Sequence, residues 1–344
     1  MLTSSPLRVI QYGLGPIGLA CVRTVLSKAD TGQIELVGAI DVDPQKVGRD
    51  VGDLLGSGET TGIVVSDDAA RTLDEARPDV VLHTTSSFLP GVRDQLLGCV
   101  RAGVHVVSST EELSFPFDRH PALAAELDEA AEDAGVVLVG TGVNPGYAMD
   151  TLALTATGVC VGVSRVHVER IVDAGLRRGP LQRKVGAGIS EADFEEKKAT
   201  GKFGHIGLRE SLLMIADGLG WPLDAINESL RPMIADRAHR TPHVTVEEGA
   251  VTGIRHSITG AVGGEVVISL DLRMYVGAED PRDRVRVEGD PPVELVVPGG
   301  IFGDTATVAT LVNTAALVGE ARPGLRTMAE LPVPRAFATR PAKG

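Results

Sequence analysis

The segment of residues 8–26, RVIQYGLGPIGLACVRTVL, constrains the fold more than any other part of the chain. An apolar run is followed by glycines in the spacing G-x-G-x-x-G, and a helical pattern follows the glycines. In a strand–turn–helix unit these glycines permit the tight turn, the approach of a pyrophosphate, and close packing of helix on strand. A purely structural glycine turn is the alternative. We predict a dinucleotide site made by Gly13, Leu14, Gly15, Pro16, Ile17 and Gly18.

Strands and helices alternate through the first part of the chain. Apolar strands are predicted at residues 7–13, 35–43, 79–87, 105–110 and 136–146, with helical patterns between several of them. Strands that are apolar throughout are typical of a parallel sheet covered on both faces. Because crossover connections are right-handed, the pattern predicts a doubly wound α/β Rossmann domain over residues 1–147.

The pattern changes after Asp150. Strands with alternating character, punctuated by Gly and Asp, are predicted at residues 164–174, 243–262, 265–278, 283–290 and 292–300. Alternation of this kind favours an antiparallel sheet, so residues 148–300 are predicted to form a second, α+β domain. Residues 301–336 are expected to return as a helical segment that packs on the Rossmann domain, and residues 338–344 are expected to be disordered.

Composition excludes several classes of protein. The chain has 33 Lys and Arg against 46 Asp and Glu, a net charge of −13, which argues against nucleic acid or an anionic membrane as a partner. No apolar run reaches about 18 residues, and the N-terminus lacks a signal-peptide pattern, so a cytoplasmic protein is expected. The three cysteines lie far apart, and no metal-ligand spacing is present, so neither a metal site nor a disulfide framework is predicted.

The second strand ends in an acidic residue that bears on the choice of cofactor. Asp41 is placed to accept a hydrogen bond from the ribose 2′-hydroxyl, which favours NAD. Lys46 and Arg49 lie just beyond it, and they offer positive charge to the 2′-phosphate of NADP. The alternative for these two cations is a solvated helix face. The sequence therefore leaves NAD and NADP both open.

Hydroxyl groups follow the strand that ends near His83. The stretch HTTSS places Thr84, Thr85 and Ser86 at the carboxyl edge of the sheet, where loops line the cofactor crevice. We expect them to contact the nicotinamide ribose. The compatible alternative is capping of the next helix by Ser86 or Ser87.

Two adjacent carboxylates follow the next strand, in SSTEEL. Glu111 and Glu112 lie at the same edge of the sheet, where a carboxylate is able to act as general acid or base or to hold a substrate ammonium. The alternative is an acidic helix start favoured by the helix dipole. Because adjacent side chains usually point apart, at most one is expected to face substrate.

The remaining candidates lie at the domain junction and beyond it. In GTGVNPGYAMD, Asn144 and Pro145 are expected to contact the cofactor and Tyr147 the substrate, with a simple hinge as the alternative. His205 and His256, in the second domain, are candidate substrate contacts, although a lone histidine is more often an ordinary core or surface residue.

Taken together, YGLGPIG, HTTSS, SSTEEL, GTGVNPGYAMD and GHIGLRES resemble the dihydrodipicolinate-reductase-like dehydrogenases, and more closely the 2,4-diaminopentanoate and related amine dehydrogenases. The resemblance implies a Rossmann domain, an α+β domain that also makes a homodimer, and a cleft between them. It implies interconversion of an amine and a carbonyl with ammonia, through an imine, using NAD or NADP. The family's key glutamate follows the fifth strand, so Glu111 is preferred and Glu112 is retained. The His-His-x-x-x-Lys stretch of the dihydrodipicolinate reductases is absent, which argues against that activity.

The substrate is less constrained. A diamino acid needs a cationic partner for its carboxylate, and Arg170 is the main candidate, with Arg177 and Arg178 as others. Val172 and Ala174 make the surroundings of Arg170 apolar, which favours a small aliphatic ketone or aldehyde. A carbonyl reductase that does not use ammonia is the second enzyme hypothesis, and a dinucleotide-sensing regulator is the non-enzyme hypothesis.

Overall fold

The computed structural model describes residues 5–201 and 203–337, and its chain divides into two compact units. The first unit contains the residues up to Tyr147 together with the residues from Gly303 onward, and the second contains Ala148–Phe302. The tail at 338–344, for which disorder is expected, lies outside the described residues.

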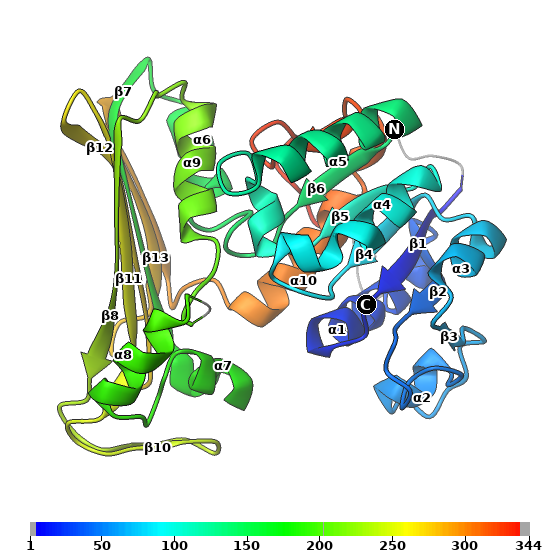
Figure 1. The fold of residues 1–344 in the computed structure, drawn as a ribbon, viewed down its shortest axis with the longest axis horizontal. Helices are drawn as coiled ribbons and strands as arrows, with labels where there is room; N and C mark the ends of the chain where they lie inside the picture. Colours follow the sequence, from blue (N-terminus) through cyan, green and yellow to red (C-terminus); the bar gives the residue numbers. More distant parts are fainter. Residues whose placement is uncertain (1–4, 202, 338–344) are drawn as a thin grey trace, which may run out of the picture. The chain divides into compact units, whose positions relative to one another are not determined.

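The first unit is built on a parallel sheet of seven strands (Figure 1). The order of strands in the sheet changes direction between β1 (Leu7–Tyr12) and β4 (Val80–His83). The carboxyl ends of these two strands therefore form the topological switch point, where sheets of this kind bind ligands. In spatial order the strands are β3 (Val65–Ser66), β2 (Ile34–Ile40), β1 (Leu7–Tyr12), β4 (Val80–His83), β5 (His105–Ser108), β6 (Val137–Gly140) and β15 (Gly324–Arg326).

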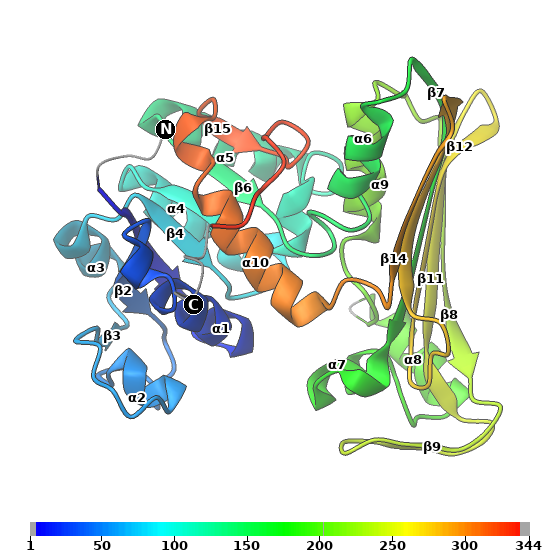
Figure 2. The ribbon, with the colours of Figure 1, turned by 180° about the vertical axis from the view of Figure 1, so that it is seen from behind.

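Helices cover both faces of this sheet. The helical elements of the unit are α1 (Pro16–Leu26), η1 (Ala29–Thr31), α2 (Val51–Leu55), α3 (Ala69–Ala76), η2 (Leu89–Val92), α4 (Arg93–Arg101), η3 (Glu111–Ser114), α5 (Pro121–Ala134), α10 (Gly303–Ala315) and η5 (Val318–Glu320). Helices α1 and α10 pack together on one face, and α4 and α5 pack together on the other (Figure 2). Two of these helices end next to a glycine, since Gly103 and Gly135 both have positive φ angles just beyond α4 and α5.

The second unit contains a six-stranded sheet and a short hairpin. In spatial order the strands are β14 (Val293–Pro298), β13 (Arg282–Asp290), β7 (Gly162–Asp173), β12 (Glu265–Tyr275), β11 (Val251–Val262) and β8 (Ala225–Ile234). The hairpin pairs β9 (His239–Arg240) with β10 (Thr245–Val246). The sheet differs from the predicted antiparallel one in a single pairing, because β7 and β12 run parallel and the sheet is therefore mixed.

One face of the second sheet carries the helices of this unit. They are α6 (Thr151–Thr157), η4 (Ala174–Leu176), α7 (Gly179–Lys184), α8 (Glu191–Ala199) and α9 (Leu208–Gly218). Helices α6 and α9 lie along the same face, and their apolar side chains join the core formed by alternate residues of the strands (Figure 1). The strand register also sets Arg170 of β7 opposite Asp283 of β13, which matters for the site described next.

Candidate active site

The glycine loop between β1 and α1 has the geometry that the sequence motif requires. Gly13 has a φ of +89°, and a Cβ there would lie 2.8 Å from the carbonyl oxygen of Thr84. A Cβ on Gly18 would lie 1.9 Å from the carbonyl oxygen of Gly13, so close packing excludes any side chain. A Cβ on Gly15 would meet no atom within 4 Å. The middle glycine therefore faces open space, where a pyrophosphate is able to approach the backbone.

The start of α1 suits an anionic ligand. Gly15 is the N-cap residue and Pro16 occupies the first turn, and no side chain caps this N-terminus. The helix dipole and the amide groups of the first turn are therefore directed toward whatever lies in front of the loop. The residues present fit a dinucleotide, with the loop from Gly13 to Gly18 holding its pyrophosphate.

Asp41 lies at the carboxyl end of β2 and closes the adenosine side of the site. Its carboxylate accepts hydrogen bonds from the backbone amides of Leu14 at 2.6 Å and Asp43 at 2.9 Å, and from Lys46 Nζ at 3.1 Å. Burial alone would raise the pKa of Asp41, but these amides and the Lys46 ammonium outweigh it and hold the pKa below its ordinary value. Asp41 is therefore anionic and already bound to the glycine loop.

The hydroxyl groups that follow β4 are used inside the protein. Thr84 Oγ1 accepts a hydrogen bond from Gln11 Nε2 at 2.8 Å and donates to the Gly13 carbonyl at 2.9 Å. Thr85 Oγ1 donates to Gln95 Oε1 at 2.8 Å. Ser86 Oγ accepts from the backbone amide of Phe88 at 3.2 Å, a local turn contact, and no side chain caps η2 or α4, so the alternative capping role is not found. Thr84 therefore supports the glycine loop through Gly13, and contact of Thr84, Thr85 and Ser86 with the cofactor stays a prediction.

Sequence reasoning did not single out His83, which organises this edge of the sheet. The imidazole is fully buried, with Nδ1 2.9 Å from Ser108 Oγ and Nε2 2.9 Å from Gln95 Oε1. Burial lowers the pKa of His83 to about 4, although the hydrogen bond with Gln95 acts in the opposite direction. His83 is therefore neutral near pH 7, and it ties the ends of β4 and β5 together.

The two adjacent glutamates have different environments. Glu112 is buried and accepts a hydrogen bond from the backbone amide of Leu89 at 2.8 Å. Glu112 Oε2 also lies 2.9 Å from His120 Nε2, and Glu112 Oε1 lies 3.9 Å from Arg119 Nε. Glu111 is half-buried at the start of η3, and its carboxylate has no hydrogen bond or ion pair with the residues that the structure describes. Of the two, only Glu111 has a carboxylate available to a ligand.

The junction segment after β6 is tied to α10. The amide of Val143 donates to Thr307 Oγ1 at 3.3 Å, and Asn144 is buried beside a cis peptide bond to Pro145. Tyr147 is half-buried and is the last residue of this stretch of the first unit. The structure places Asn144 and Pro145 just beyond the carboxyl end of β6, at the same edge as Glu111.

In the second unit, Arg170 is an internal ion-pair residue. Its guanidinium donates to Asp283 Oδ1 at 2.6 Å and to the Ile301 carbonyl at 2.8 Å, and its side chain is 3% exposed. The geometry argues against the predicted contact with a substrate carboxylate, because the charge is already matched by Asp283. Arg177, the neighbouring candidate, is buried with its guanidinium 5.1 Å from the ring centre of Phe302.

The two predicted histidines lie side by side in the second unit. The rings of His205 and His256 meet edge to face with centroids 6.4 Å apart, and His256 Nε2 lies 2.7 Å from Glu228 Oε1. His256 Nδ1 and His205 Nε2 are buried and have no hydrogen-bond partner within the described part of the chain. Burial, reinforced by the nearby charge of Lys184, keeps the pKa of His205 well below its ordinary value. The sequence did not show that these two residues are neighbours.

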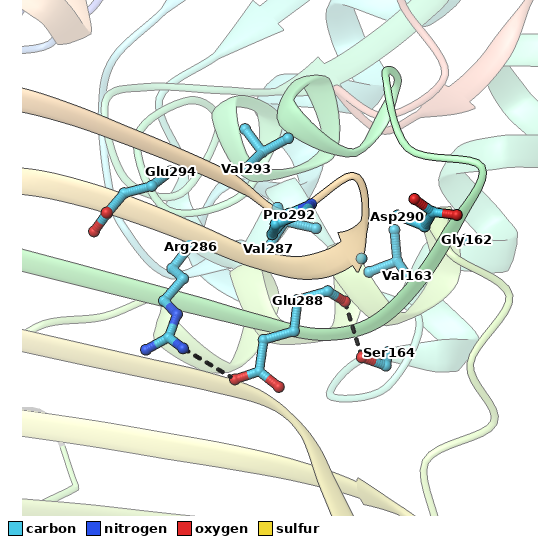
Figure 3. Close-up of a pocket in the computed structure, with 11 residues that line it drawn as sticks. Gly162, Val163, Ser164, Arg286, Val287, Glu288, Asp290, Pro292, Val293 and Glu294 are labelled. Atoms are coloured by element: carbon cyan, nitrogen blue, oxygen red, sulfur yellow. Dashed lines mark hydrogen bonds and ion pairs between the residues drawn. The ribbon is translucent and has the colours of Figure 1, made fainter.

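A separate hollow of about 820 Å³ lies where β13 ends and where β7 and β14 begin in the second unit (Figure 3). Glu288 is central to it: its carboxylate lies 3.7 Å from Arg286, and its carbonyl accepts a hydrogen bond from Ser164 at 2.9 Å. None of the predicted site residues lines this hollow.

Over the described ranges, no group of three or more His, Cys, Asp or Glu is arranged to hold a metal ion, and no helix is long and apolar enough to cross a membrane.

A doubly wound sheet with this glycine loop defines the class of dinucleotide-binding Rossmann proteins. A family model described as the 2,4-diaminopentanoate dehydrogenase C-terminal domain matches residues 147–343. The 2,4-diaminopentanoate dehydrogenase of Acetoanaerobium sticklandii is 33% identical over 342 residues, which cover 96% of this chain and 94% of that protein. The chain belongs to the 2,4-diaminopentanoate dehydrogenase family.

Two amine dehydrogenases are also similar over nearly the whole chain. The amine dehydrogenase of Streptomyces virginiae is 27% identical over 360 aligned positions, which cover 94% of this chain and 96% of that protein. The structure of an amine dehydrogenase from Mycobacterium smegmatis superposes with a TM-score of 0.83 at 28% identity, covering 98% of this chain and 99% of that one. The predicted fold and the predicted class, an NAD(P)-dependent oxidoreductase of the amine dehydrogenase type, are confirmed.

Proposed function

We propose that the chain catalyses the reversible reductive amination of a small carbonyl compound with ammonia. Ammonia adds to the carbonyl carbon, water leaves, and the resulting iminium carbon accepts a hydride to give the amine. The nicotinamide dinucleotide, when bound at the glycine loop, supplies that hydride and is oxidised. The observation that carries the proposal is the available Glu111 carboxylate at the carboxyl edge of β5, in a member of this dehydrogenase family.

Glu111 has the chemistry that the amination steps need. Nitrogen gains positive charge as ammonia adds to the carbonyl, and it must lose a proton before water departs. A carboxylate beside the reacting carbon accepts this proton, returns it to the leaving hydroxyl, and stabilises the iminium cation. Glu112 has a different role in this proposal, because its bonds to Leu89 and His120 hold η3 in place and so position Glu111.

The second unit favours a substrate without a carboxylate. Arg170 is neutralised by Asp283, so it offers little to an anionic group. Nε2 of His256 lies 2.7 Å from Glu228 Oε1, and its Nδ1 is buried without a hydrogen-bond partner among the described residues, so Nδ1 is the ring atom left to meet a ligand. We propose that His205 and His256 of the second unit contact a small, mostly apolar carbonyl compound or its amine. The 2,4-diamino acid named in the family is the alternative substrate.

A panel of carbonyl compounds tests this function. Cyclohexanone, pentanal and 2-amino-4-oxopentanoate are each incubated with NADH or NADPH, with and without ammonia, and absorbance of the reduced cofactor is followed. We expect turnover that depends on ammonia and is faster with the uncharged carbonyls. Turnover independent of ammonia would identify a carbonyl reductase, and a strong preference for the amino keto acid would contradict the proposed substrate class.

Substitution of the two glutamates tests their roles. Glu111→Gln is expected to lower kcat by roughly 100-fold or more, because a positioned acid–base group contributes about 10²–10⁴ in rate. Glu112→Gln is expected to lower the melting temperature as well as kcat, since it weakens the pair with His120. Glu129→Gln, at an exposed position of α5, is the matched control. NADH binding is measured in all three, and near-normal kcat in Glu111→Gln would refute the assignment.

We further propose that the outer face of the second sheet joins two copies of the chain. Helices α6 and α9 lie on one face of this sheet (Figure 2). The other face carries cross-strand ion pairs, among them Arg255–Asp271 at 2.9 Å and Arg273–Glu169 at 3.4 Å. A face that carries both signs of charge is able to complement a second copy of itself. Light scattering at micromolar concentration is expected to give the mass of a dimer, and Arg273→Glu a monomer. A monomeric parent chain would refute this proposal.

A further inference from the structure

Asp41, at the carboxyl end of β2, forms an ion pair with Lys46 from the loop that follows the strand. Lys46 Nζ lies 3.1 Å from Asp41 Oδ2 and 3.4 Å from Asp43 Oδ2. Both partners are substantially buried, with 24% of the Lys46 side chain and 10% of the Asp41 side chain exposed. The lysine is therefore held against Asp41, in the position where Rossmann proteins read the adenosine ribose.

Few acceptor positions remain on Asp41. A carboxylate has about four lone-pair positions. Oδ2 is used by the Leu14 amide and Lys46, and Oδ1 is used by the Asp43 amide. About one position is left, which is enough for a single ribose hydroxyl but not for a pair. The charge of Asp41, which would otherwise repel a 2′-phosphate, is offset by the adjacent ammonium.

We infer that Lys46, rather than Arg49, is the residue that recognises the 2′-phosphate of NADPH. With NADH, Asp41 accepts the 2′-hydroxyl while Lys46 remains on its two carboxylates. With NADPH, Lys46 supplies a charge-assisted hydrogen bond to the 2′-phosphate and shields that phosphate from Asp41. This inference rests on the nicotinamide site of the proposed function and extends it to one specificity-determining residue.

Arg49 is the competing cation. It is exposed, and the only hydrogen bond of its side chain among the described residues is a long one of 3.5 Å from Nη1 to the Gln45 carbonyl. Arg49 is therefore not held toward Asp41, and ordering it on a phosphate would cost side-chain entropy that Lys46 has already lost. For this reason we assign the larger effect to Lys46.

Binding measurements without any carbonyl substrate test the inference. NADH and NADPH are titrated into the intact chain and detected by nicotinamide fluorescence, and 2′,5′-ADP and ADP are used as competitors for the adenosine side alone. For the parent chain, we expect the two Kd values to agree within about tenfold. Lys46→Gln is expected to raise the Kd of NADPH and of 2′,5′-ADP by roughly 10- to 100-fold, while the Kd of NADH changes less than about threefold.

Two further variants make the test specific. Arg49→Gln is expected to change the NADPH Kd by less than about threefold, and Lys198→Gln, in α8 of the second unit, is expected to change neither Kd. An effect confined to Arg49→Gln, or equal effects of Lys46→Gln on both cofactors, would overturn the inference. If neither cofactor binds the parent chain, the nicotinamide site itself fails, and that outcome is distinct from a wrong assignment of Lys46.

Discussion

Acid is expected to destabilise the first unit through His83. The imidazole is fully buried and its pKa is lowered to about 4 from an ordinary 6.5, chiefly because burial disfavours the charged ring. The unfolded chain therefore binds a proton at a higher pH than the folded chain does. The contribution of neutral His83 to stability is fully present above about pH 6.5, is lost progressively as the pH falls, and is gone below about pH 4.

The magnitude follows from the two pKa values. Their difference corresponds to about 3 kcal/mol once both states are protonated, because each pKa unit is worth about 1.4 kcal/mol. At pH 5 the folded state is still mostly neutral while the unfolded state is mostly protonated, and the loss relative to pH 7.5 is about 2 kcal/mol. This is a large share of the total stability of an ordinary domain.

His83→Gln removes the titration while retaining a side chain that is able to bond Ser108 and Gln95. Hydrogen exchange of peptides from β4 and β5 gives the opening free energy of the first unit, and both proteins are measured at pH 7.5 and pH 5. Between pH 7.5 and pH 5, the opening free energy of the parent protein is expected to fall by about 2 kcal/mol more than that of the variant. NMR titration of the eight histidines supplies an independent check. A His83 resonance that titrates near pH 6.5, or equal acid sensitivity of the two proteins, would refute the reasoning.

Two other predictions use matched pairs of substitutions. Gly18→Ala places a Cβ 1.9 Å from a backbone oxygen and is expected to cost about 1–3 kcal/mol, whereas Gly15→Ala is expected to keep the parent melting temperature while weakening NADH binding at least about tenfold. Equal melting temperatures for the two variants would contradict this expectation. Arg170→Met leaves the buried charge of Asp283 unpaired and is expected to cost about 3–5 kcal/mol in urea unfolding followed by Trp221 fluorescence, and adding Asp283→Leu is expected to recover most of that loss. Parent-like unfolding of Arg170→Met, with a raised KM for a carboxylate substrate, would instead make Arg170 a substrate ligand.

The apolar strands of the first unit were predictable because each is buried on both faces and bounded by glycine, proline or polar residues. Strand β8 was not predicted, because Pro232 and several polar residues break its pattern, and an edge strand tolerates both. Strand β15 was not predicted either, because it has only three residues and pairs with β6, which lies far from it in the sequence. The parallel pairing of β7 with β12 was also missed, since alternation of side chains does not reveal strand direction.

Within the site, the sequence identifies residue types at strand ends but not their partners. The sequence alone does not distinguish Glu111 from Glu112. They differ in the structure because Leu89 and His120 bond to Glu112. Arg170 is neutralised by Asp283 on another strand, a pairing that no local signal contains. The hydrogen bonds and ion pairs that side chains form between strands are therefore the part of the site that the sequence does not predict.

The first unit takes its last helix and its edge strand from the end of the chain, and this has a consequence for synthesis. Residues up to Tyr147 leave the ribosome first, but α10 and β15 appear only after all of Ala148–Phe302 has been made. The second unit is continuous in sequence, so all of its own segments are available before the sheet of the first is complete. Until β15 arrives, β6 presents an unpaired edge and the face that α10 covers stays open. The nascent chain therefore carries its nucleotide-binding half unfinished through most of translation.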